Sequence, residues 1–554
     1  IMADRVVDLN AEAVRSYGKN TFKLKPFEHI TTVNTGDLVP LFATAQIQPG
    51  DSWNITTSIL ARLNTSKYPT IARGEIVYMW VYVPHVQIWD HWNELMGENT
   101  ESAWISQTTY SVPQIEIPQG TPVLSCTLLD YEGAAVAQDE YEMSALIHRA
   151  YLWACDQIAR DQNIEAPFAP ATDDNNIVYD PTDFTKGGVP YKINRKADWA
   201  STALPEPQKG PDVLLPLGTR APIKSFSPSN LPPSEYRQST YLFNIDGSVA
   251  AGTVNRTLGN GTDGHLNTFN VQNTNAMTVT NLAQYADLSS ATSANIIAVR
   301  KAVITQHIFE RDARSGTRAP EMLWARWGVE VDPLELGRPR ILTMGSFTIE
   351  FHQVVQNSES TNTSKQGTLT AFGYTNNREE NGTFSFKYHG TLMCLVAIRF
   401  EHKYQQGMRE EFFKKDRWDF WHPEYAGLGD QPIYTRNLYA TGGASGTINA
   451  KTIFGYGVRG WEYQNYPSMV TGQAKSQYNG TVASGATIDF THMADIYNSE
   501  PTLSSTWMKE NADNVDRTIF VQSSITQQWL IDFIAEFTVT TTMPLYSIPG
   551  IDRI

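Results

Sequence analysis

The hydrophobic pattern of this chain is dominated by short apolar runs of strand length, separated by turn-forming residues. The clearest run covers residues 76–83, where β-branched and aromatic side chains follow one another without a polar position, and Pro84 ends it. A strand without a polar face must be covered on both sides. The Trp-rich stretch 88–98 behind it predicts one short helical turn or loop that packs back over the strand end.

Further strands are predicted on both sides of this run. Phe22, Leu24 and Phe27 alternate with charged residues, which indicates an edge-like strand. In the last strand, the pattern places Leu530 and Phe533 in the interior. The strands predicted in addition to 76–83 lie at 22–27, 37–48, 52–63, 341–355, 384–400 and 529–542, with a turn at 49–51 and a nearly all-apolar core strand at 392–400.

Two helices are predicted between the strands. Apolar residues in 139–161 recur at spacings of three and four, and an acidic first turn suits the helix dipole. This pattern favours a helix that packs on the core over an amphipathic membrane or partner helix. Residues 294–309 predict a second helix, which is expected to end in a charged turn, 310–318, with Gly316 near its stop. The buried stripe of the first helix is predicted to contain Met143, Leu146, Ile147, Ala150, Trp153, Ala154 and Ile158.

A change of amino-acid composition marks one long insertion. Residues 203–233 are rich in proline, and the tract that follows is rich in Gly, Asn and Thr with few charges. Apolar positions between 241 and 279 alternate as in short strands, which favours an ordered segment over a free linker. We therefore predict a core made of 1–207 and 291–554 and a surface-projecting β insertion at 208–290.

Composition supports a mainly β protein. Of the 554 residues, 41% are hydrophobic and only 18% are charged, with 37 Gly and 29 Pro. Low charge with many turn-forming residues favours short strands joined by long turns over helical bundles. The net charge of −15 argues against a surface that binds nucleic acid nonspecifically all over, because phosphate neutralisation requires a surplus of Lys and Arg. The net charge does not exclude a local basic patch that binds nucleic acid.

The cysteines and the hydropathy suggest an intracellular setting. Cys126, Cys155 and Cys394 are odd in number and widely spaced, so neither a disulfide framework nor a zinc site is indicated, and free buried thiols are expected. No stretch approaches the roughly 18 to 20 apolar residues of a membrane-spanning helix, and the sequence does not start with a signal-peptide pattern. We expect a protein that is made and kept in a reducing cytoplasm.

One glycine motif resembles a dinucleotide fingerprint. Residues 455–460 read Gly-Tyr-Gly-Val-Arg-Gly, but that fingerprint needs a preceding strand and a helix that opens on its last glycine. An aromatic stretch broken by Pro467 follows instead, so we assign the motif to a turn. No phosphate-binding Gly-Lys-Ser/Thr loop and no nucleophile elbow occurs in the sequence.

Histidines near acidic residues are candidate metal ligands. His85, Asp90 and His91 lie close together in sequence, but no third or fourth ligand recurs at ligand spacing, which favours a structural role. The same interpretation applies to His389, His402 and His422, each of which has aromatic neighbours. We expect a protein that is not an enzyme and that uses no cofactor or metal.

Basic and aromatic residues interleave between 403 and 422, as in proteins that bind single-stranded nucleic acid through cations on phosphates and rings on bases. Acidic residues in the same segment nearly cancel its charge, which favours a subunit or intrachain contact. Arginines in 311–318 form a second candidate cluster of similar weight. The candidate nucleic-acid-binding residues are Lys403, Arg409, Lys414, Lys415 and Arg417, with Arg311, Arg314 and Arg318.

Short segments spread over nearly the whole chain resemble one family in the order in which they occur. They are Val83-Pro84 with Trp89-Asp90-His91-Trp92 and Gly97-Glu98, then 202–210, 310–318, 404–407, 454–456 and 543–550. Together they resemble the major capsid protein of the Microviridae, the small tailless icosahedral bacteriophages with circular single-stranded DNA. The resemblance is greatest to the gokushovirus-like branch.

This resemblance implies a fold and partners. It implies an eight-stranded viral jelly roll, a β-sandwich with long loop insertions and a few helices, that self-assembles into a T=1 shell of sixty copies through threefold and fivefold contacts. Packaged single-stranded DNA, a small basic DNA-binding protein, a DNA pilot protein and a bacterial cell-surface receptor contacted by 208–290 are the implied partners. The implied locations are the virion and, during assembly, the host cytoplasm.

Two other classes of protein fit parts of the sequence. A β-rich glycan-binding or depolymerising phage surface protein would share the abundance of Trp, Tyr, Asn and Gly, and would place a carboxylate pair in an aromatic cleft. A phage spike or fibre would show sequence repeats, and we find no period. A shell of defined size, rather than hydrolase activity or a fibrous trimer, distinguishes the capsid interpretation from both.

Overall fold

The computed structural model describes residues 18–67, 71–98, 108–211, 213, 223–225, 256–260, 266–270, 284–286, 296–315, 318–357, 360, 366–367, 369–440, 451–471, 495–521 and 523–543. The chain divides into two compact units, one formed by Ile1–Pro207 with Asp312–Ile554 and the other by Gln208–Arg311. Because no comparison tests the predicted division at 208–290, that division stays a prediction.

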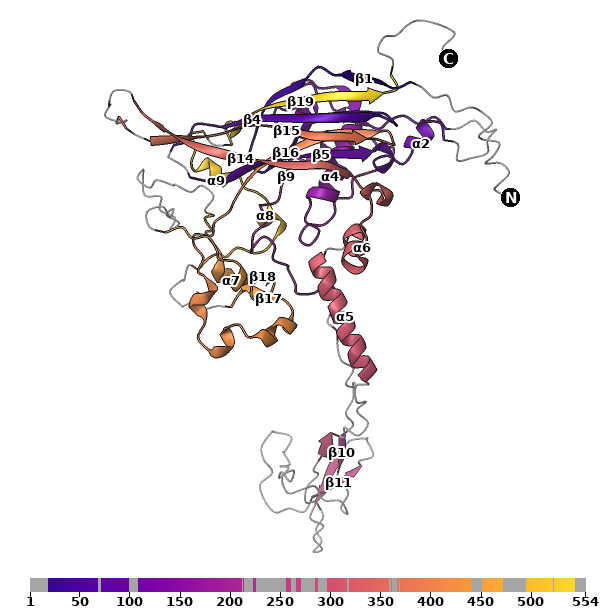
Figure 1. Ribbon diagram of the computed structural model, residues 1–554. Coiled ribbons are helices and arrows are strands. Elements are labelled where there is room, and N and C mark those ends of the chain that lie inside the picture. Colours follow the sequence, from indigo (N-terminus) through magenta and orange to yellow (C-terminus); the bar gives the residue numbers. More distant parts are fainter. Residues whose placement is uncertain are drawn as a thin grey trace. The chain divides into compact units, whose positions relative to one another are not determined.

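The first unit contains one large antiparallel sheet of ten strands (Figure 1). Its strand order is β1-β19-β4-β15-β14-β5-β16-β3-β9, and β2 also pairs with β19. The strands are β1 (Asn20–Lys23), β2 (Phe27–Val33), β3 (Asp37–Ile47), β4 (Ser52–Leu63), β5 (Gly74–Pro84), β9 (Tyr191–Lys192), β14 (Arg340–Val355), β15 (Leu369–Ser385), β16 (Gly390–Phe400) and β19 (Trp529–Thr541).

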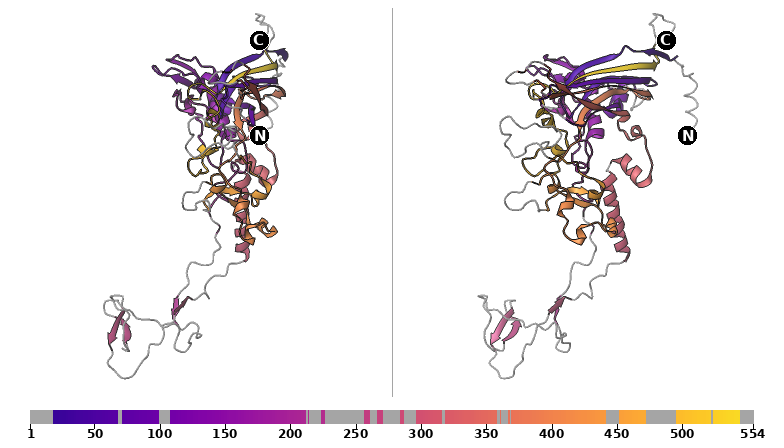
Figure 2. Two further views of the ribbon diagram at one scale, coloured as in Figure 1. Left: turned by 90° about the vertical axis from the view of Figure 1, so that its left-hand side faces the viewer. Right: turned by 60° about the vertical axis from the view of Figure 1, so that its left-hand side comes forward.

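Strand β14 connects two halves of this sheet. Its residues 340–349 pair with β5, and its residues 350–355 pair with β15. Side chains from both halves meet in one apolar core: β4 and β19 contribute from one half, and β3, β5 and β16 from the other. The two halves are therefore the layers of a β-sandwich, as Figure 2 allows the reader to follow from two further directions. The predicted mainly β fold is confirmed.

The turn predicted at 49–51 joins the two layers. Strands β3 and β4 flank it, yet they do not pair with each other: β3 pairs with β16 and β9, whereas β4 pairs with β15 and β19. These two consecutive strands thus lie in different layers, and most of the sheet is built from long-range pairs.

Strand β5 is covered on both faces, as its sequence predicts. Tyr78 and Trp80 point into the core between the layers. Met79 and Val81 point the other way, into a second apolar cluster that includes Tyr151. Every residue of the strand except Glu75 is buried. The Trp-rich turn behind it also forms as predicted, with a 3₁₀ turn at His85–Gln87 and helix α2 (Trp92–Leu95).

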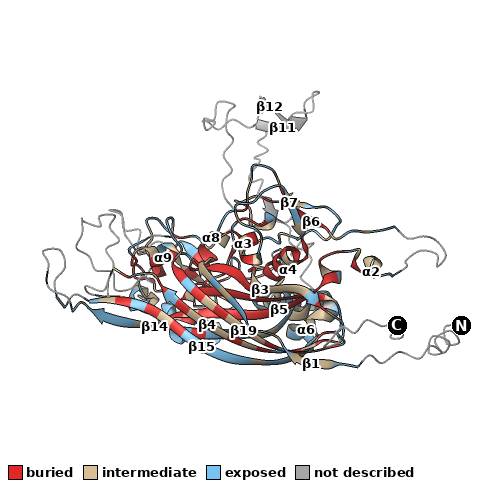
Figure 3. Cartoon of the chain, turned by 90° about the horizontal axis from the view of Figure 1, so that it is seen from above, coloured by how far each residue is buried: buried red, intermediate tan, exposed pale blue. Residues whose placement is uncertain are grey.

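Strand β19 corrects one predicted interior position. Trp529, Ile531 and Phe533 are fully buried, whereas Leu530 is 37% exposed. Because side chains alternate across a strand, Leu530 and Phe533 lie on opposite faces and cannot both be interior. The same alternation of buried and exposed positions is visible along β4 and β19 in Figure 3.

The first predicted helix is shorter than expected. Residues 141–144 form strand β7, which pairs with β6 (Gln114–Ile117) and carries Met143 into a different apolar cluster. Helix α4 covers Leu146–Ala154, and a π-helical turn follows at Cys155–Ala159. The acidic residues at 139–142 are therefore not its first turn. Almost every side of α4 is buried, so a single stripe at helical spacing underestimates its packing.

The second predicted helix is longer than expected. Helix α5 covers Ile296–Ser315, so the charged residues predicted to form a turn continue the helix. Ion pairs explain why they are tolerated there: Asp312 accepts from Arg326 at 2.6 Å, and Arg314 lies 3.0 Å from Asp430. Gly316 lies outside the described residues. Helix α6 (Ala319–Trp327), which the sequence pattern did not predict, follows.

The predicted strand at 384–400 is in fact two strands. β15 ends at Ser385 and β16 begins at Gly390. Most of β15 was missed because its buried positions are the small or polar residues Ala371, Gly373 and Thr375, and its middle part is polar and exposed. The predicted strand at 341–355 is confirmed as β14.

Smaller sheets and helices surround the sandwich. Strands β6, β7 and β8 form a three-stranded sheet, and β17 pairs with β18. In the second unit, β10 pairs with β13 and β11 with β12. The remaining bounds are β7 (Tyr141–Ser144), β8 (Ile177–Val178), β10 (Ile223–Ser225), β11 (Arg256–Asn260), β12 (Leu266–Asn270), β13 (Gln284–Ala286), β17 (Gln431–Tyr434), β18 (Ile453–Gly457), α3 (Leu128–Glu132), α7 (Trp461–Gln464), α8 (Ser505–Met508) and α9 (Asp513–Asp516).

Candidate functional site

A cavity lies in a lobe of the first unit, which we call the pocket lobe and define as residues 403–440 and 451–471. It has a small core of its own, in which Ile433 of β17, Phe454 of β18 and Trp461 of α7 meet Ala203 and Trp507. The backbone of Leu204 pairs with that of Tyr456. A Cβ added at Gly455 would lie 3.0 Å from the side chain of Ala203, so this close approach requires glycine.

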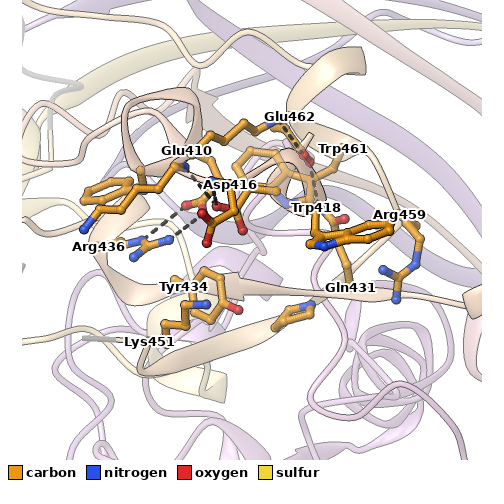
Figure 4. A pocket seen from close by; sticks show the side chains of 15 residues that line it. Glu410, Asp416, Trp418, Gln431, Tyr434, Arg436, Lys451, Arg459, Trp461 and Glu462 are labelled. Atoms are coloured by element: carbon orange, nitrogen blue, oxygen red, sulfur yellow. Dashed lines mark hydrogen bonds and ion pairs between the residues drawn. The ribbon is translucent and has the colours of Figure 1, made fainter. Parts of the chain in front are cut away.

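The cavity has a volume of about 400 Å³ and a mixed lining of rings and charges (Figure 4). That volume is in the range of small-ligand sites. The lining combines residues from a loop, from β17 and from α7, which are far apart in sequence. It consists of Glu410, Phe413, Lys414, Lys415, Asp416, Trp418, Asp419, Gln431, Pro432, Tyr434, Arg436, Lys451, Arg459, Trp461 and Glu462.

Four of the nine charged side chains that line the cavity form two ion pairs. Glu410 accepts from the Nε of Arg436 at 3.2 Å, and the Nζ of Lys414 lies 3.4 Å from Glu462 and donates to the hydroxyl of Tyr463 at 2.7 Å. Partial burial alone lowers the pKa of Lys414, but the bond to Tyr463 and the charge of Glu462 together raise it. Neighbouring groups of the protein therefore favour the charged form of Lys414.

A second pair of contacts shapes the loop at the rim of the cavity. The carboxylate of Asp419 accepts from the backbone N–H groups of Lys415 and Asp416, both at 2.9 Å, and these bonds lower the pKa of Asp419. The guanidinium of Arg417 lies 4.1 Å from the ring centre of Trp418. In the part of the chain that the structure describes, Lys415 and Arg417 form no ion pair.

The remaining predicted basic residues occupy different settings. Lys403 is half-buried, and Arg409 lies 3.0 Å from Glu411. Arg314 reaches the pocket lobe through Asp430. Arg318 does not reach the pocket lobe. It donates to the backbone carbonyls of Asp156 and Arg160, and therefore joins α6 to the π-helical turn that follows α4. Arg311 is exposed and belongs to the second unit. The structure thus keeps Arg409, Lys414, Lys415 and Arg417 in one segment and binds Arg314 to the same lobe at Asp430. Nucleic-acid binding by the eight residues stays a prediction.

The sequence patterns missed part of the cavity lining. Tyr434 and Arg436 come from β17 and the turn that follows it, and Lys451 and Arg459 flank β18. No motif joins these residues to 410–419, because the antiparallel pairing of β17 with β18 is what places them together. The sequence offered one signal for these lining residues, namely the single cations next to β17 and β18: Arg436, Lys451 and Arg459.

The glycine motif is only partly a turn. Gly455 and Gly457 lie in β18, which corrects the assignment of the whole motif to a turn, and Gly460 has a φ of +79° at the start of α7. The strand pairs in an antiparallel manner with β17, and α7 has only four residues. A dinucleotide fingerprint requires a longer helix that follows a parallel strand.

The histidines take part in contacts within the protein, buried at His85 and exposed at His91 and His422. His85 lies 3.1 Å from the hydroxyl of Thr391 and its ring packs against Trp92; burial, with a smaller effect of His389, lowers its pKa to about 4. His91 bonds to Asp174 at 2.9 Å. His389 packs against Trp92, and His422 lies against Trp418. Across the described residues, no three His, Cys, Asp or Glu side chains gather in a way that suits a metal ion.

The cysteine thiols and the helices bear on the expectations of free thiols and of no membrane-spanning helix. Cys155 and Cys394 are buried and Cys126 is partly exposed, and none of the three is in a disulfide. Burial raises the pKa of the thiols of Cys155 and Cys394, so both stay protonated near neutral pH. Among the described helices, none has both the length and the apolar character needed to span a bilayer.

Comparison with known proteins gives one consistent result. The profile of the family described as "Capsid protein (F protein)" matches residues 17–551. "Capsid protein VP1" of Bdellovibrio phage phiMH2K is 30% identical over 546 residues, which cover 97% of this chain and 94% of the relative. Proteins of the same name from Chlamydia phage 1 and Spiroplasma virus 4 are 28% and 30% identical, with at least 94% of each relative covered.

Proposed function

This chain belongs to the capsid protein (F protein) family of the Microviridae, and from that premise we propose that its copies assemble into a T=1 icosahedral shell around a single-stranded DNA genome. The observation that carries the proposal is the match of the family over residues 17–551 together with near-complete coverage of three capsid relatives. The capsid protein is thus a component of the virion; its assembly in the host cytoplasm is part of the proposal.

The proposal includes the eight-stranded jelly roll. Strands β2, β19, β4 and β15 are neighbours in that order in one layer, and β3, β16, β5 and β14 are neighbours in the other. In this order β2 and β19 pair, and consecutive strands alternate between layers except for β5 and β14, which pair within one layer. This connectivity supports a double Greek-key connection. The long connections between strands provide the loops that would meet neighbouring copies.

Charge supports a division of labour in genome packaging. The chain carries a net charge of −15, so it supplies no surplus of cations for the phosphates it would enclose. We therefore assign genome neutralisation to a small basic DNA-binding protein, and genome delivery to a DNA pilot protein. Contact with a bacterial cell-surface receptor is assigned to residues 208–290.

The pocket lobe bears on the alternative of a glycan-binding or depolymerising protein. Its cavity does combine carboxylates with exposed rings. A glycosidase, however, needs one carboxyl group with a raised pKa, whereas Glu410 and Glu462 are held by Arg436 and Lys414 and the pKa of Asp419 is lowered. This arrangement favours a structural protein without enzymatic activity.

Electron microscopy of particles purified from phage-producing cells tests the proposal. We expect closed particles of one diameter that contain this chain as the main protein and protect single-stranded DNA from nuclease. A monodisperse monomer that hydrolyses polysaccharide, with no shell in those cells, would overturn the proposal.

A further inference from the structure

Residues 408–428 expose rings and aliphatic side chains to an unusual degree; we call them the aromatic segment. Phe412 is 65% exposed, Trp418 60% and Phe420 52%. Met408, Trp421 and Leu428 are exposed as well. Single exposed apolar residues are ordinary on a protein surface, but a contiguous group of this kind marks an interaction site.

Two charges of the aromatic segment are turned inward. The side chains of Glu410 and Lys414 are only 17% and 7% exposed, because they form ion pairs with Arg436 and Glu462 beneath the segment. Other charged side chains of the segment are exposed and carry both signs: Glu411, Lys415, Asp416, Arg417, Asp419 and Glu424. The outer surface of the segment therefore combines exposed rings with charges of both signs.

The segment is also rigid without a partner. It forms three 3₁₀ helices, at Glu410–Phe413, Arg417–Asp419 and Pro423–Leu428. His422 bonds to the backbone carbonyl of Arg417 at 2.9 Å, and the guanidinium of Arg459 donates to the carbonyl of Gly429 at 2.8 Å. A surface that is already ordered loses little conformational entropy when it is covered, so its rings are available as binding anchors.

Apolar exposure continues beyond the segment. Tyr463, Tyr466 and Met469 lie in the same lobe and are 45%, 74% and 61% exposed. Lys414 connects the two stretches, since it bonds to Tyr463 and lies 5.6 Å from the ring centre of Phe420. Trp, Tyr, Phe, Met and Arg are the residues enriched where proteins bind one another.

The charge balance distinguishes between possible occupants. Nucleic acid also covers rings, but it requires free cations for its phosphates. Within the described part of the lobe, Lys403, Lys415, Arg417, Lys451 and Arg459 form no ion pair, whereas Arg409, Lys414 and Arg436 are each paired. Seven Asp and Glu residues nearly balance the eight Lys and Arg residues of the lobe. The surface of the aromatic segment is nearly neutral and rich in rings. It therefore suits a protein partner better than a polyanion such as nucleic acid.

We propose that the aromatic segment, with Tyr463, Tyr466 and Met469, is a contact between neighbouring copies of this chain in the shell. This inference rests on the proposed function, because a shell-forming family supplies the second copy. Standard interfaces bury about 800 Å² on each partner around a few aromatic anchors. Phe412 and Trp418 are the anchors, and the internal ion pairs hold them in place.

The test replaces similarly exposed aromatic rings inside and outside the segment in the full-length chain. Phe412→Ala and Trp418→Ala, each alone and combined, are compared with Phe520→Ala, whose ring is 64% exposed but lies outside the segment. Assembled particles are separated from free chains by sedimentation. We expect the combined variant to lower the particle yield at least tenfold, and Phe520→Ala to assemble as the unsubstituted chain does.

Two further measurements keep the result interpretable. Thermal unfolding of the free chains should be unchanged in the variants, because the replaced rings pack on little within one copy; a matching loss of stability would attribute the defect to misfolding and overturn the inference. Normal particle yield with lost DNA content or lost host adsorption would assign the segment to nucleic acid or receptor instead. If the unsubstituted chain forms no particles, the proposed function itself fails.

Discussion

At the scale of single residues, buried charges hold the loops that surround the sandwich. Arg149 of α4 is 1% exposed, and its guanidinium donates to the carbonyls of Asp173 and Asn175 at 2.7 and 2.8 Å and to that of Ile88 at 3.3 Å. One side chain thus fixes both the Trp-rich turn behind β5 and the loop at 172–176. Carbonyl oxygens that lose such a donor inside the protein cost free energy.

Replacing this guanidinium tests its structural role. We expect Arg149→Met to lower the free energy of unfolding by about 3 kcal/mol, since three buried carbonyls lose a charged donor. Arg73→Met is the matched control, because the Arg73 side chain is 83% exposed and should change stability by less than about 0.5 kcal/mol. Urea unfolding of unassembled chains measures both. Equal effects of the two substitutions would contradict the assignment.

A buried histidine makes stability depend on pH. His402 lies 3.0 Å from Glu510 and 3.1 Å from Asp495. Burial by itself lowers the pKa of His402, but the charges of Glu510 and Asp495 exceed that effect and raise it to about 10. A histidine whose pKa is raised on folding stabilises the protein fully below its unfolded pKa, near 6.5, and this contribution is lost as pH rises toward 10.

The expected signature is a difference between two chains. The stability of the unsubstituted chain minus that of His402→Gln should be largest near pH 6 and should shrink by up to about 1.4 kcal/mol for each pH unit above 6.5. Urea unfolding at pH 6, 7, 8 and 9 measures it. A difference that does not vary over this range would show that His402 is not protonated in the folded chain.

At the scale of elements, alternation decides which face of a strand is buried. The structure places Phe533 of β19 in the core at 0% exposure and Leu530 of the same strand on the outer face at 37%. We expect Phe533→Ala to destabilise the chain by about 3 to 5 kcal/mol and Leu530→Ala by less than about 1 kcal/mol. Thermal unfolding of the two variants side by side checks the assignment. A larger effect at Leu530 would reverse the faces of the strand.

The same short segment can fit both a helical and a strand pattern of apolar residues. The spacing of apolar residues predicted one helix over 139–161, yet 141–144 pair with β6 as a strand and the helix starts at Leu146. The local pattern does not distinguish these outcomes, because four residues can satisfy either period. The presence of a neighbouring strand edge decided between them.

At the scale of the whole molecule, the β-sandwich belongs to one compact unit, and most of the predicted insertion belongs to the other. The pocket lobe anchors the chain on both sides of the inserted residues, through the pairing of Leu204 with Tyr456 and the ion pair of Arg314 with Asp430. We therefore expect a chain in which a short linker replaces 212–288 to fold and to assemble into particles. Circular dichroism, thermal unfolding and electron microscopy check these points. Wholly insoluble protein would show that the insertion belongs to the core.

The sequence by itself determined the strand-rich class, the doubly buried strand at 76–83, the position of β14 and the capsid family. Each of these follows from local periodicity or from short motifs, which are encoded by neighbouring residues. Only the tertiary structure decided which layer each strand joins, where α4 begins, that Leu530 faces outward, and that Glu410 and Lys414 of the aromatic segment at 408–428 turn inward to ion-pair partners. These features depend on partners far along the chain, such as Thr541 opposite Asn20 or Arg436 beneath Glu410, and one-dimensional patterns carry no record of such pairs.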